Sequence, residues 1–373
     1  MSPLLYVRRN PARTLPFVLV ISLSVVMVAS VVTVVNSIDL TVYTFYGYNR
    51  YVTGLTPRNA LAVDEDIVRE VRHLPQMGYL AGAHSYQVML RTIFGRLIFP
   101  IFGLSPEARE RLMRVCQVTV SEGRMLREGA AEAVVSEEVA RNLGVKVGDN
   151  LLFPESEDRY APVPVKLVGL LRGASWLGLT SKSFVDRHSP YTWQGYLAFA
   201  RTPELQEELG REMEQRVDRS RARVWPFSYV VRETQLSLAN LYLVLGVIIS
   251  IVVFTISFVC GLLANIYFTQ RLPEIATLSA IGYTRNLLLA RAGMETVIYC
   301  MVGWGAGCVI TIGVLTAIKA TLITPRGLLL NPLDFSAYLF TVPLPITITL
   351  FALLTIACRL ARLDPVSIIE RRG

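Results

Sequence analysis

Between two long apolar stretches the chain reads Arg271-Leu272-Pro273-Glu274-Ile275-Ala276-Thr277-Leu278-Ser279-Ala280-Ile281-Gly282-Tyr283-Thr284-Arg285. The segment is basic at both ends, and Ile275, Leu278 and Ile281 recur at the spacing of one helix face. A short amphipathic helix held between two membrane spans can receive a push from a soluble partner. The pattern therefore predicts a docking element, not a catalytic one, in a chain that transmits motion.

The flanking composition is that of a membrane protein with a large soluble part, because 52% of the 373 residues are apolar. Each of four charge-free windows reaches the roughly 20 residues that a membrane-spanning helix needs. The second window is about 55 Å long as a helix, against a hydrocarbon core of about 30 Å, so we expect its beginning to form a stalk. The windows are Thr14–Ile38, Thr234–Gln270, Thr296–Ile318 and Phe335–Cys358.

Orientation follows from Lys and Arg near the span ends, which favour the cytoplasmic side. Both termini and the connection between the second and third windows carry such residues, so we expect all three in the cytoplasm. We interpret the first window as an uncleaved anchor, because its apolar run exceeds the ~7–15 residues typical of a signal peptide. The basic residues are Arg8, Arg9, Arg13, Arg271, Arg285, Arg291, Arg359, Arg362, Arg371 and Arg372.

The predicted fold is a membrane α-helical protein with four transmembrane helices and a large α+β extracytoplasmic domain of two lobes, inserted between helices 1 and 2. The predicted cytoplasmic parts are 1–14, 271–291 and 359–373. The predicted helices are 15–38, 234–270 (including the stalk), 292–319 and 335–358. The predicted extracytoplasmic parts are 39–233, with lobe one at 58–104 and 190–225 and the inserted lobe at 105–189, and the loop 320–334.

Charge and cysteine content narrow the class of partner. Residues 39–233 carry 25 Lys and Arg against 24 Asp and Glu, so +7 of the net charge of +8 lies elsewhere. The basic balance is thus a topology signal, and no nucleic-acid partner is expected. Cys116 is the only cysteine in that segment, which excludes a disulfide within it. With three histidines and no Cys/His cluster, we expect no metal site.

Within the external domain, periodicity and turn residues predict alternating strands and helices. We expect strands near Ala60 and at Tyr79–Leu90, Leu97–Leu104, Val163–Leu171 and Tyr196–Ala200. We expect helices at Asp64–Leu74, Pro106–Val115, Glu132–Leu143 and Pro203–Arg223, and a loop from Gly173 to Gly195.

Three residues of the predicted helix 292–319 have helix-packing potential. Glu295 lies four residues after Arg291, so the two share a helix face, and we prefer a structural ion pair there to proton transfer. Gly303 and Gly307 form a small-xxx-small face. That face permits either dimerisation or packing against another span of the same chain, and the sequence does not choose between them.

Several separated segments together resemble the MacB/FtsX-like superfamily of ABC transporter permeases, of the mechanotransmission type (type VII). The resemblance rests on Leu5–Leu15, on Glu122-Gly123-Arg124 with the pattern that follows to Leu170, and on Arg271–Gly282. It rests also on Glu295, Gly303 and Gly307, and on Ala357–Glu370 with Pro365. Pro273 and Trp304 depart from the pattern and bear on coupling and helix packing.

The resemblance implies a permease dimer, with a second copy or a paralogue, working with two cytoplasmic ABC ATPase subunits. No G-x-x-x-x-G-K-[ST] phosphate loop occurs in this chain, so we expect no cofactor here and ATP and Mg²⁺ on the partner ATPase. The alternative for the apolar ridge of the 271–285 segment is that it lies against the membrane interface. The expected docking residues are Leu272, Glu274, Ile275, Leu278, Ile281 and Gly282.

Our leading hypothesis is an inner or plasma membrane permease that transmits ATP-driven motion to its external domain and exports or extracts an amphiphile. Lipids, lipopeptides, peptides and haem-like molecules fit that description. The alternative is a mechanotransmitter that moves no substrate and activates an external cell-wall hydrolase, adaptor or signalling partner. A membrane-anchored enzyme is disfavoured, because the sequence holds no G-x-S-x-G elbow and no metal-ligand spacing.

Overall fold

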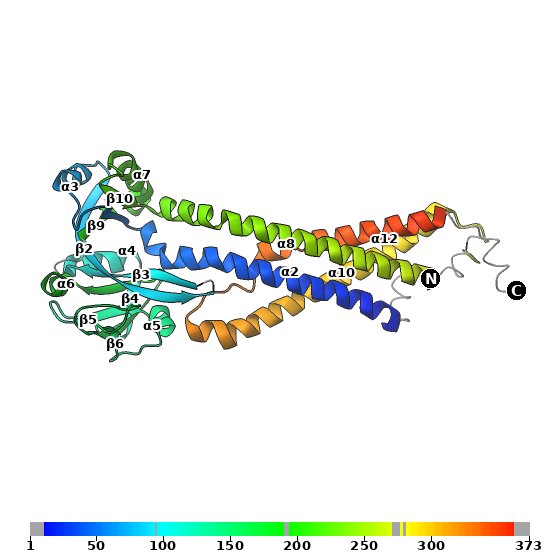
Figure 1. Cartoon of the computed structure of the whole chain (residues 1–373), viewed down its shortest axis with the longest axis horizontal. Helices are drawn as coiled ribbons and strands as arrows, with labels where there is room; N and C mark the ends of the chain where they lie inside the picture. Colours follow the sequence, from blue (N-terminus) through cyan, green and yellow to red (C-terminus); the bar gives the residue numbers. More distant parts are fainter. Residues whose placement is uncertain (1–10, 94, 190–193, 271–276, 279–280, 362–373) are drawn as a thin grey trace. The chain divides into compact units, whose positions relative to one another are not determined.

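The computed structural model describes residues 11–93, 95–189, 194–270, 277–278 and 281–361 (Figure 1). The chain divides into two compact units, which are described separately. Unit 1 comprises residues 1–36, 240–319 and 331–373. Unit 2 comprises residues 37–239 and 320–330.

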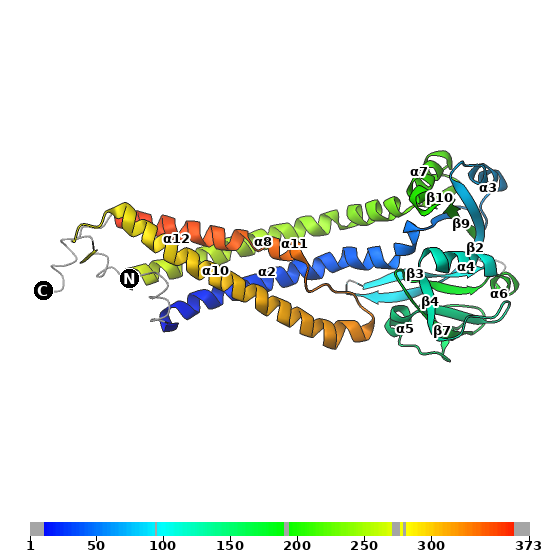
Figure 2. The same cartoon turned by 180° about the vertical axis from the view of Figure 1, so that it is seen from behind.

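Unit 1 is made of long apolar helices (Figure 2). Four α2 residues, Ile21, Val25, Val28 and Val32, follow a helical spacing and form its core together with Cys300, Leu344 and Ile348. The opposite face of α2 is also apolar, with Leu19, Leu23 and Met27 exposed, so α2 is apolar all round. The helices that contribute to unit 1 are α2 (Pro11–Phe45), α8 (Phe227–Gln270), α10 (Arg285–Ile318), α11 (Phe335–Leu339) and α12 (Pro343–Ala361).

Three stretches of the described chain are long and apolar enough to cross a membrane: Leu15–Phe45, Asn286–Arg326 and Phe335–Cys358. In α8, the described side chains give a shorter apolar run, Tyr242–Ile256. The structure thus shows three long apolar helices together with a mixed α+β unit whose chain follows the first of them. The four-span arrangement remains a prediction.

Unit 2 contains one ten-stranded mixed sheet in the order β10-β1-β9-β2-β3-β8-β5-β7-β4, with β6 paired to β7. The strands are β1 (Thr53–Pro57), β2 (Met77–Thr92), β3 (Gly95–Leu104), β4 (Val118–Gly123), β5 (Glu132–Ser136), β6 (Asn150–Leu152), β7 (Val165–Gly173), β8 (Gly178–Ser181), β9 (Gln194–Ala200) and β10 (Ala222–Trp225). The helices are η1 (Gly47–Arg50), α3 (Glu65–Arg72), α4 (Pro106–Val115), α5 (Glu137–Leu143), α6 (Lys182–His188), η2 (Pro203–Leu205) and α7 (Gln206–Arg216). The helical turns η3 (Lys319–Ile323) and η4 (Thr324–Arg326) follow α10.

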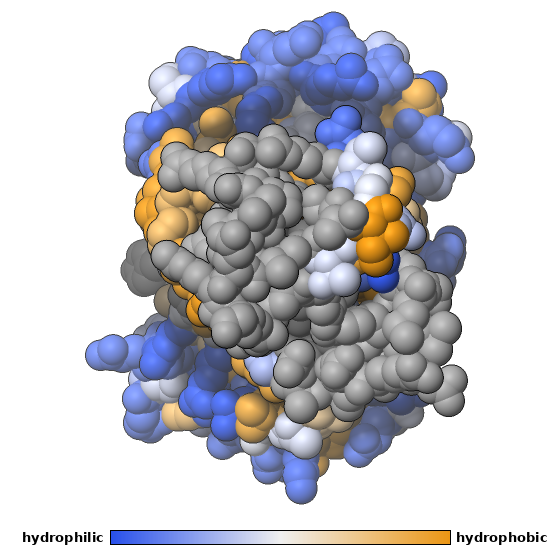
Figure 3. All heavy atoms as spheres, turned by 90° about the vertical axis from the view of Figure 1, so that its right-hand side faces the viewer, coloured by the Kyte–Doolittle hydropathy of each residue, from blue (hydrophilic) through white to orange (hydrophobic). Residues whose placement is uncertain are grey.

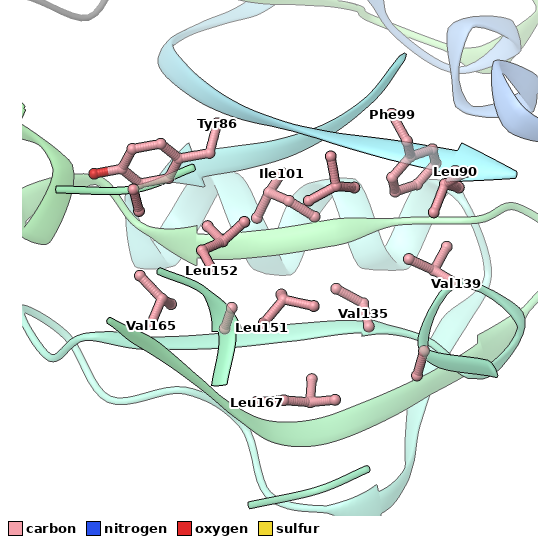
Figure 4. Close-up of a cluster of buried hydrophobic side chains, with 14 of the residues drawn as sticks. Tyr86, Leu90, Phe99, Ile101, Val135, Val139, Leu151, Leu152, Val165 and Leu167 are labelled. Atoms are coloured by element: carbon pink, nitrogen blue, oxygen red, sulfur yellow. The ribbon is translucent and has the colours of Figure 1, made fainter. Parts of the chain in front are cut away.

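The long β2–β3 hairpin separates two faces of the sheet by strict alternation. Tyr86, Val88 and Leu90 of β2 point with Phe99 and Ile101 of β3 into one buried cluster. In Figure 4, Tyr86, Leu90, Phe99 and Ile101 lie opposite a second set of side chains of the same cluster: Leu151 and Leu152 of β6, Val135 of β5, and Val165 and Leu167 of β7. The intervening residues of both strands face the other side, which matters for the cavity described below.

Most predicted elements of this unit are confirmed, namely those now seen as α3, β2, β3, α4, β7 and β9. The helix predicted at Glu132–Leu143 is wrong in its first half, which is strand β5. This strand lies between β7 and β8, with Ala133 and Val135 in one buried cluster and Val134 in another. A strand buried on both faces reads as a continuous apolar run, so its period could not distinguish it from a helix.

Three further predictions are wrong in position or type. The loop expected from Gly173 to Gly195 contains β8 and α6, where Ser181 caps the helix by accepting a hydrogen bond from the Phe184 N–H. The helix expected at Pro203–Arg223 ends at Arg216, because Val217 is extended and an Asp218 turn leads into β10. The strand expected near Ala60 lies earlier, at β1.

One unbroken set of strand pairings joins the regions assigned to the two predicted lobes. β3 of the first region pairs in parallel with β8 of the second, from Phe102–Leu179 to Leu104–Ser181. The hydrogen-bonded sheet thus runs through both regions. The boundaries of the two lobes remain a prediction.

The Glu122-Gly123-Arg124 motif has a structural role. A Cβ on Gly123, which has φ 75°, would lie 2.3 Å from the Val168 carbonyl oxygen. Arg124 donates from both guanidinium ends to Glu132, and the Arg127 N–H donates to the same carboxylate. Chiefly through the hydrogen bond from Arg124, this arrangement lowers the pKa of Glu132 to about 2 from its usual 4.5. The motif thus holds β4 against β5 and β7.

We predict that Glu132→Gln lowers the stability of the full-length protein near neutral pH by on the order of 1 kcal/mol, a figure reduced for the exposure of Arg124. Because the folded-state pKa is depressed, the stabilisation exists above about pH 4.5 and is lost toward about pH 2. Unfolding temperatures of parent and variant should therefore converge on acidification. A difference that stays constant from neutral pH to about pH 3 would contradict this assignment.

Candidate functional site

The small-residue face of α10 packs on α2 of the same chain. A Cβ added to Gly303 would lie 2.9 Å from Cβ of Ile21, and one added to Gly307 would lie 2.7 Å from Cβ of Val25. The Ser22 hydroxyl, on the same face of α2, donates to the Gly303 carbonyl at 2.9 Å. Of the two uses left open by the sequence, the structure shows contact within the chain.

α10 also packs against α12 near the end that follows residue 285. Glu295 is almost fully buried, and its Oε1 lies 3.8 Å from Nε of Arg291, one helical turn earlier. A Cβ on Gly293 would lie 2.7 Å from Leu353 of α12. Trp304, which departs from the family pattern, donates from Nε1 to the Thr341 hydroxyl at 2.9 Å. α10 therefore contacts α2 through Gly303 and Gly307, and α12 through Gly293.

Of the predicted docking residues, Leu272, Glu274 and Ile275 lie outside the described residues. Leu278 is half-buried and packs beside Leu288 of α10 and Ile356 of α12. Ile281, in contrast, is 71% exposed. The structure therefore separates the two described residues of the predicted ridge, since Leu278 contacts the helices and Ile281 faces outward.

Gly282 ends the helical turn of this segment. Its φ is 104°, a conformation that favours glycine, and the Tyr283 N–H donates across it to the Leu278 carbonyl at 3.1 Å. Figure 3 faces the right-hand side of Figure 1 and shows hydrophobic residues (orange) at the surface beside hydrophilic ones (blue). The segment thus presents a capped turn with an exposed apolar side chain.

In unit 2, the loop 320–330 is anchored on α5 through Asn142. The Asn142 side chain accepts from the Arg91 N–H and donates to the Arg91 carbonyl, both at 2.8 Å, and also donates to the Gly327 carbonyl at 3.4 Å. Gly327 has φ 62°, and a Cβ there would lie 2.6 Å from the Glu138 carbonyl oxygen. Leu330 is buried. No local sequence pattern indicated this anchor, because its parts come from three distant segments.

Unit 2 also contains a cavity of about 600 Å³, which the sequence did not predict. Its walls come from η1, from β1, β2, β3, β9 and β10, and from the first turns of α8. Most lining residues are apolar or aromatic, among them Tyr46, Tyr48, Phe102, Trp225 and Tyr229. Burial raises the pKa of Tyr48 above its usual range, so its phenol stays protonated.

Metal and thiol chemistry find little support in the part of the chain that the structure describes. No group of three or more His, Cys, Asp or Glu side chains there is arranged to hold a metal ion. Burial raises the pKa of the Cys116 thiol to about 12, so it is a poor nucleophile near neutral pH.

Comparison with known families gives the decisive match. Residues 240–365, which include the 271–285 segment, α10 and α12, match the family described as FtsX-like permease C-terminal. This part of the chain is an FtsX-like permease C-terminal domain. The predicted resemblance to FtsX-like permeases is therefore confirmed. Such domains belong to ABC permeases, typically the non-catalytic membrane subunit, which work with ATPase partners.

Solved structures give weaker likenesses. The chain is similar to the periplasmic region of MacB from Actinobacillus actinomycetemcomitans, with 11% identity, 51% of this chain and 93% of that chain covered, and a TM-score of 0.30. It is also similar to the extracellular domain of the ABC-type transporter YknZ from Gram-positive bacteria, with 12% identity, 44% and 92% covered, and a TM-score of 0.26. TM-scores of this size do not establish a common fold. No curated protein matches the sequence.

We predict that Gly307→Leu destabilises the helices of the FtsX-like domain, because its side chain must displace Val25. Overpacking of this kind costs about 1–3 kcal/mol. The matched control is Gly313→Leu on the same helix, where an added Cβ meets nothing within 4 Å. Thermal unfolding in detergent should separate the two variants. Equal unfolding temperatures for both would show that the close approach to α2 contributes nothing.

We also predict that Gly327→Ala releases the loop 320–330 from α5, since the new methyl group collides with backbone atoms of Glu138 and Asn142. Limited proteolysis of the full chain should then cut the loop near Arg326 faster than in the parent. Gly144→Ala serves as control, because Gly144 also has positive φ but has open space around its Cβ position. Equal cutting rates in parent and Gly327→Ala would contradict the anchor.

Proposed function

We propose that this chain is the permease subunit of an ABC transporter that transmits motion from a separate cytoplasmic ATPase to unit 2. The match of residues 240–365 to the FtsX-like permeases carries the proposal. ATP and Mg²⁺ are bound by the ATPase. A second copy of this chain, or a paralogue, completes the assembly.

The proposed topology has four spans, with both termini in the cytoplasm and residues 39–233 and 320–334 outside. Three described helices meet the length and hydropathy of a span. α8 supports a fourth span, because its 44 residues extend for about 66 Å, enough to cross a bilayer and continue beyond it. The arginines within residues 271–291 support a cytoplasmic position for this segment.

Leu272, Glu274, Ile275, Leu278, Ile281 and Gly282 form the proposed docking segment for the ATPase. Ile281 is the best supported of these, because an exposed apolar residue beside a capped helical turn suits a groove on a partner. Leu278 has a different proposed part, since its packing on Leu288 and Ile356 can pass movement of the segment to α10 and α12.

The proposed activity of the external unit is the expulsion or extraction of an amphiphile from the outer leaflet or the space beyond it. The mostly apolar cavity of unit 2 favours an amphiphilic substrate. The second candidate, a mechanotransmitter that activates an external hydrolase, adaptor or signalling partner, calls for a stable external protein whose activity depends on the ATPase.

We predict that Ile281→Arg abolishes recovery of a nucleotide-binding subunit when the tagged chain is purified from native membranes. Ile281→Leu should retain it, because it keeps the apolar contact. Ile281 is a cleaner test position than Leu278, whose substitution by Arg would also disturb the helices. Mass spectrometry of the co-purifying proteins reads out both variants. Undiminished recovery with Ile281→Arg would remove Ile281 from the docking surface, and absence of any ATPase with the parent would overturn the permease role.

A further inference from the structure

The cavity of unit 2 owes its volume to small residues on neighbouring strands. Ala83 of β2 lies opposite Gly195 of β9, and Gly54 of β1 lies opposite Leu197 and Trp225 on its two neighbouring strands. All five residues line the cavity. Larger side chains at Ala83 or Gly54 would occupy part of the cavity. The small residues at these positions therefore keep the space open.

Two aromatic side chains of the walls, Tyr46 and Trp225, have their polar atoms hydrogen-bonded within the protein. The Tyr46 hydroxyl donates to the Ile98 carbonyl, and Trp225 Nε1 donates to the Thr56 hydroxyl, both at 2.9 Å. Trp225 also meets the ring of Tyr229 edge-on, with centroids 5.5 Å apart. Because the polar atoms face the protein, the rings offer the cavity mainly apolar surface.

Five neutral polar side chains interrupt this apolar lining, namely Asn49, Thr56, Ser85, Gln87 and Thr234. Thr56 accepts from Trp225, Thr234 donates to the Val230 carbonyl, and Asn49 is hydrogen-bonded to Tyr48. Ser85 and Gln87 are alternate residues of β2, so their side chains lie on one face of the sheet. Their cross-strand neighbours on β3 are Phe102 and Pro100, respectively. Within the described chain, neither the Ser85 nor the Gln87 side chain has a hydrogen-bond partner in the protein. They can therefore donate to and accept from a ligand that enters the cavity.

The cavity lining has few ionisable side chains, and two of them contact other groups of the protein. Apart from tyrosines, the ionisable lining residues are Arg58, His84 and Glu233. Arg58 donates to the Arg219 carbonyl, and the buried His84 ring lies 2.7 Å from the Asp186 carboxylate. A nucleotide or a multiply charged ligand would find no cluster of opposite charge here, whereas an uncharged polar group would find Ser85 and Gln87.

We propose that this cavity binds the acyl chain of an amphiphile whose polar linkage is an uncharged ester or amide. The aromatic and aliphatic walls would hold the acyl chain, and Ser85 and Gln87 would hydrogen-bond the linkage. A volume near 600 Å³ lies within the ~300–1,000 Å³ of small-molecule pockets, which combine apolar walls with a few polar groups. The inference deepens the proposed export function and rests on it only for the ligand's fate.

The test uses the full chain in nanodiscs, without ATPase or nucleotide, and a monoacylglycerol that carries a photoreactive diazirine on its acyl chain. After illumination, peptide mapping should find the label on cavity peptides within residues 54–61, 83–87 and 225–234. Label on peptides of the membrane helices shows that the probe is active. Label confined to those helices would overturn the proposal.

Variants then distinguish the cavity from the surface around it. Ala83→Phe places a large side chain in the cavity and should abolish cavity labelling. Ala130→Phe, at a half-buried position outside the lining, should leave cavity labelling unchanged. Gln87→Ala, at an exposed position that tolerates change, should weaken labelling about two- to tenfold through loss of one neutral hydrogen bond. Parental labelling in Gln87→Ala and in folded Ala83→Phe would overturn the proposal.

Competition identifies the source of the acyl chain. Displacement by unlabelled monoacylglycerol alone indicates a free lipid, and displacement by an N-palmitoyl peptide indicates an acylated polypeptide. Displacement by neither would show that the labelling is not saturable and would overturn the site. Because no ATPase takes part, a negative result here leaves ATPase docking untouched, and a failure of docking leaves this binding result standing.

Discussion

The close approach of α10 to α2 depends on two positions without side chains, Gly303 and Gly307. Lipid gives apolar helices little hydrophobic reason to associate, so contact at the backbone and buried hydrogen bonds such as Ser22 to Gly303 must supply the specificity. Once α10 is held there, Trp304 can reach Thr341 and Gly293 can seat Leu353. These contacts connect α10 with α2, with α12 and with Thr341, which precedes α12.

Unit 2 is held together by a sheet. Its ten strands form one hydrogen-bonded set. Gly123 of β4 and Gly169 of β7 lie where a Cβ atom would collide with the neighbouring backbone, so the absence of a side chain there permits the close approach. Asn142 adds a cross-link of a different kind, since one side chain satisfies both backbone groups of Arg91 and contacts the Gly327 carbonyl. A force applied to the loop 320–330 therefore acts, through Asn142, on helix α5 and on strand β2 of the sheet.

The sequence predicted best the features that depend on local composition. Apolar windows located α2, α10 and α12, and the helix predicted at Pro106–Val115 is α4. It failed where tertiary context decides the structure, as in β5, whose Val134 and Val135 are buried on opposite faces. The cavity and the Asn142 anchor were beyond its reach, because Ala83 and Gly195, or Asn142 and Gly327, meet only after the chain has folded.

The composition of the cavity walls links binding to the proposed motion. Tyr46 and Tyr48 follow directly after α2, while Tyr229 and Val230 lie in the first turn of α8. The remaining walls belong to the sheet. If a partner ATPase shifts the two helices against each other, the residues at their ends must shift with them, and the space between those residues and Ala83 on the sheet must change. Under the proposed motion, a cavity with one wall on the sheet and another at the helix ends changes volume and releases its ligand without any charged group or chemical step, in keeping with its mostly apolar lining.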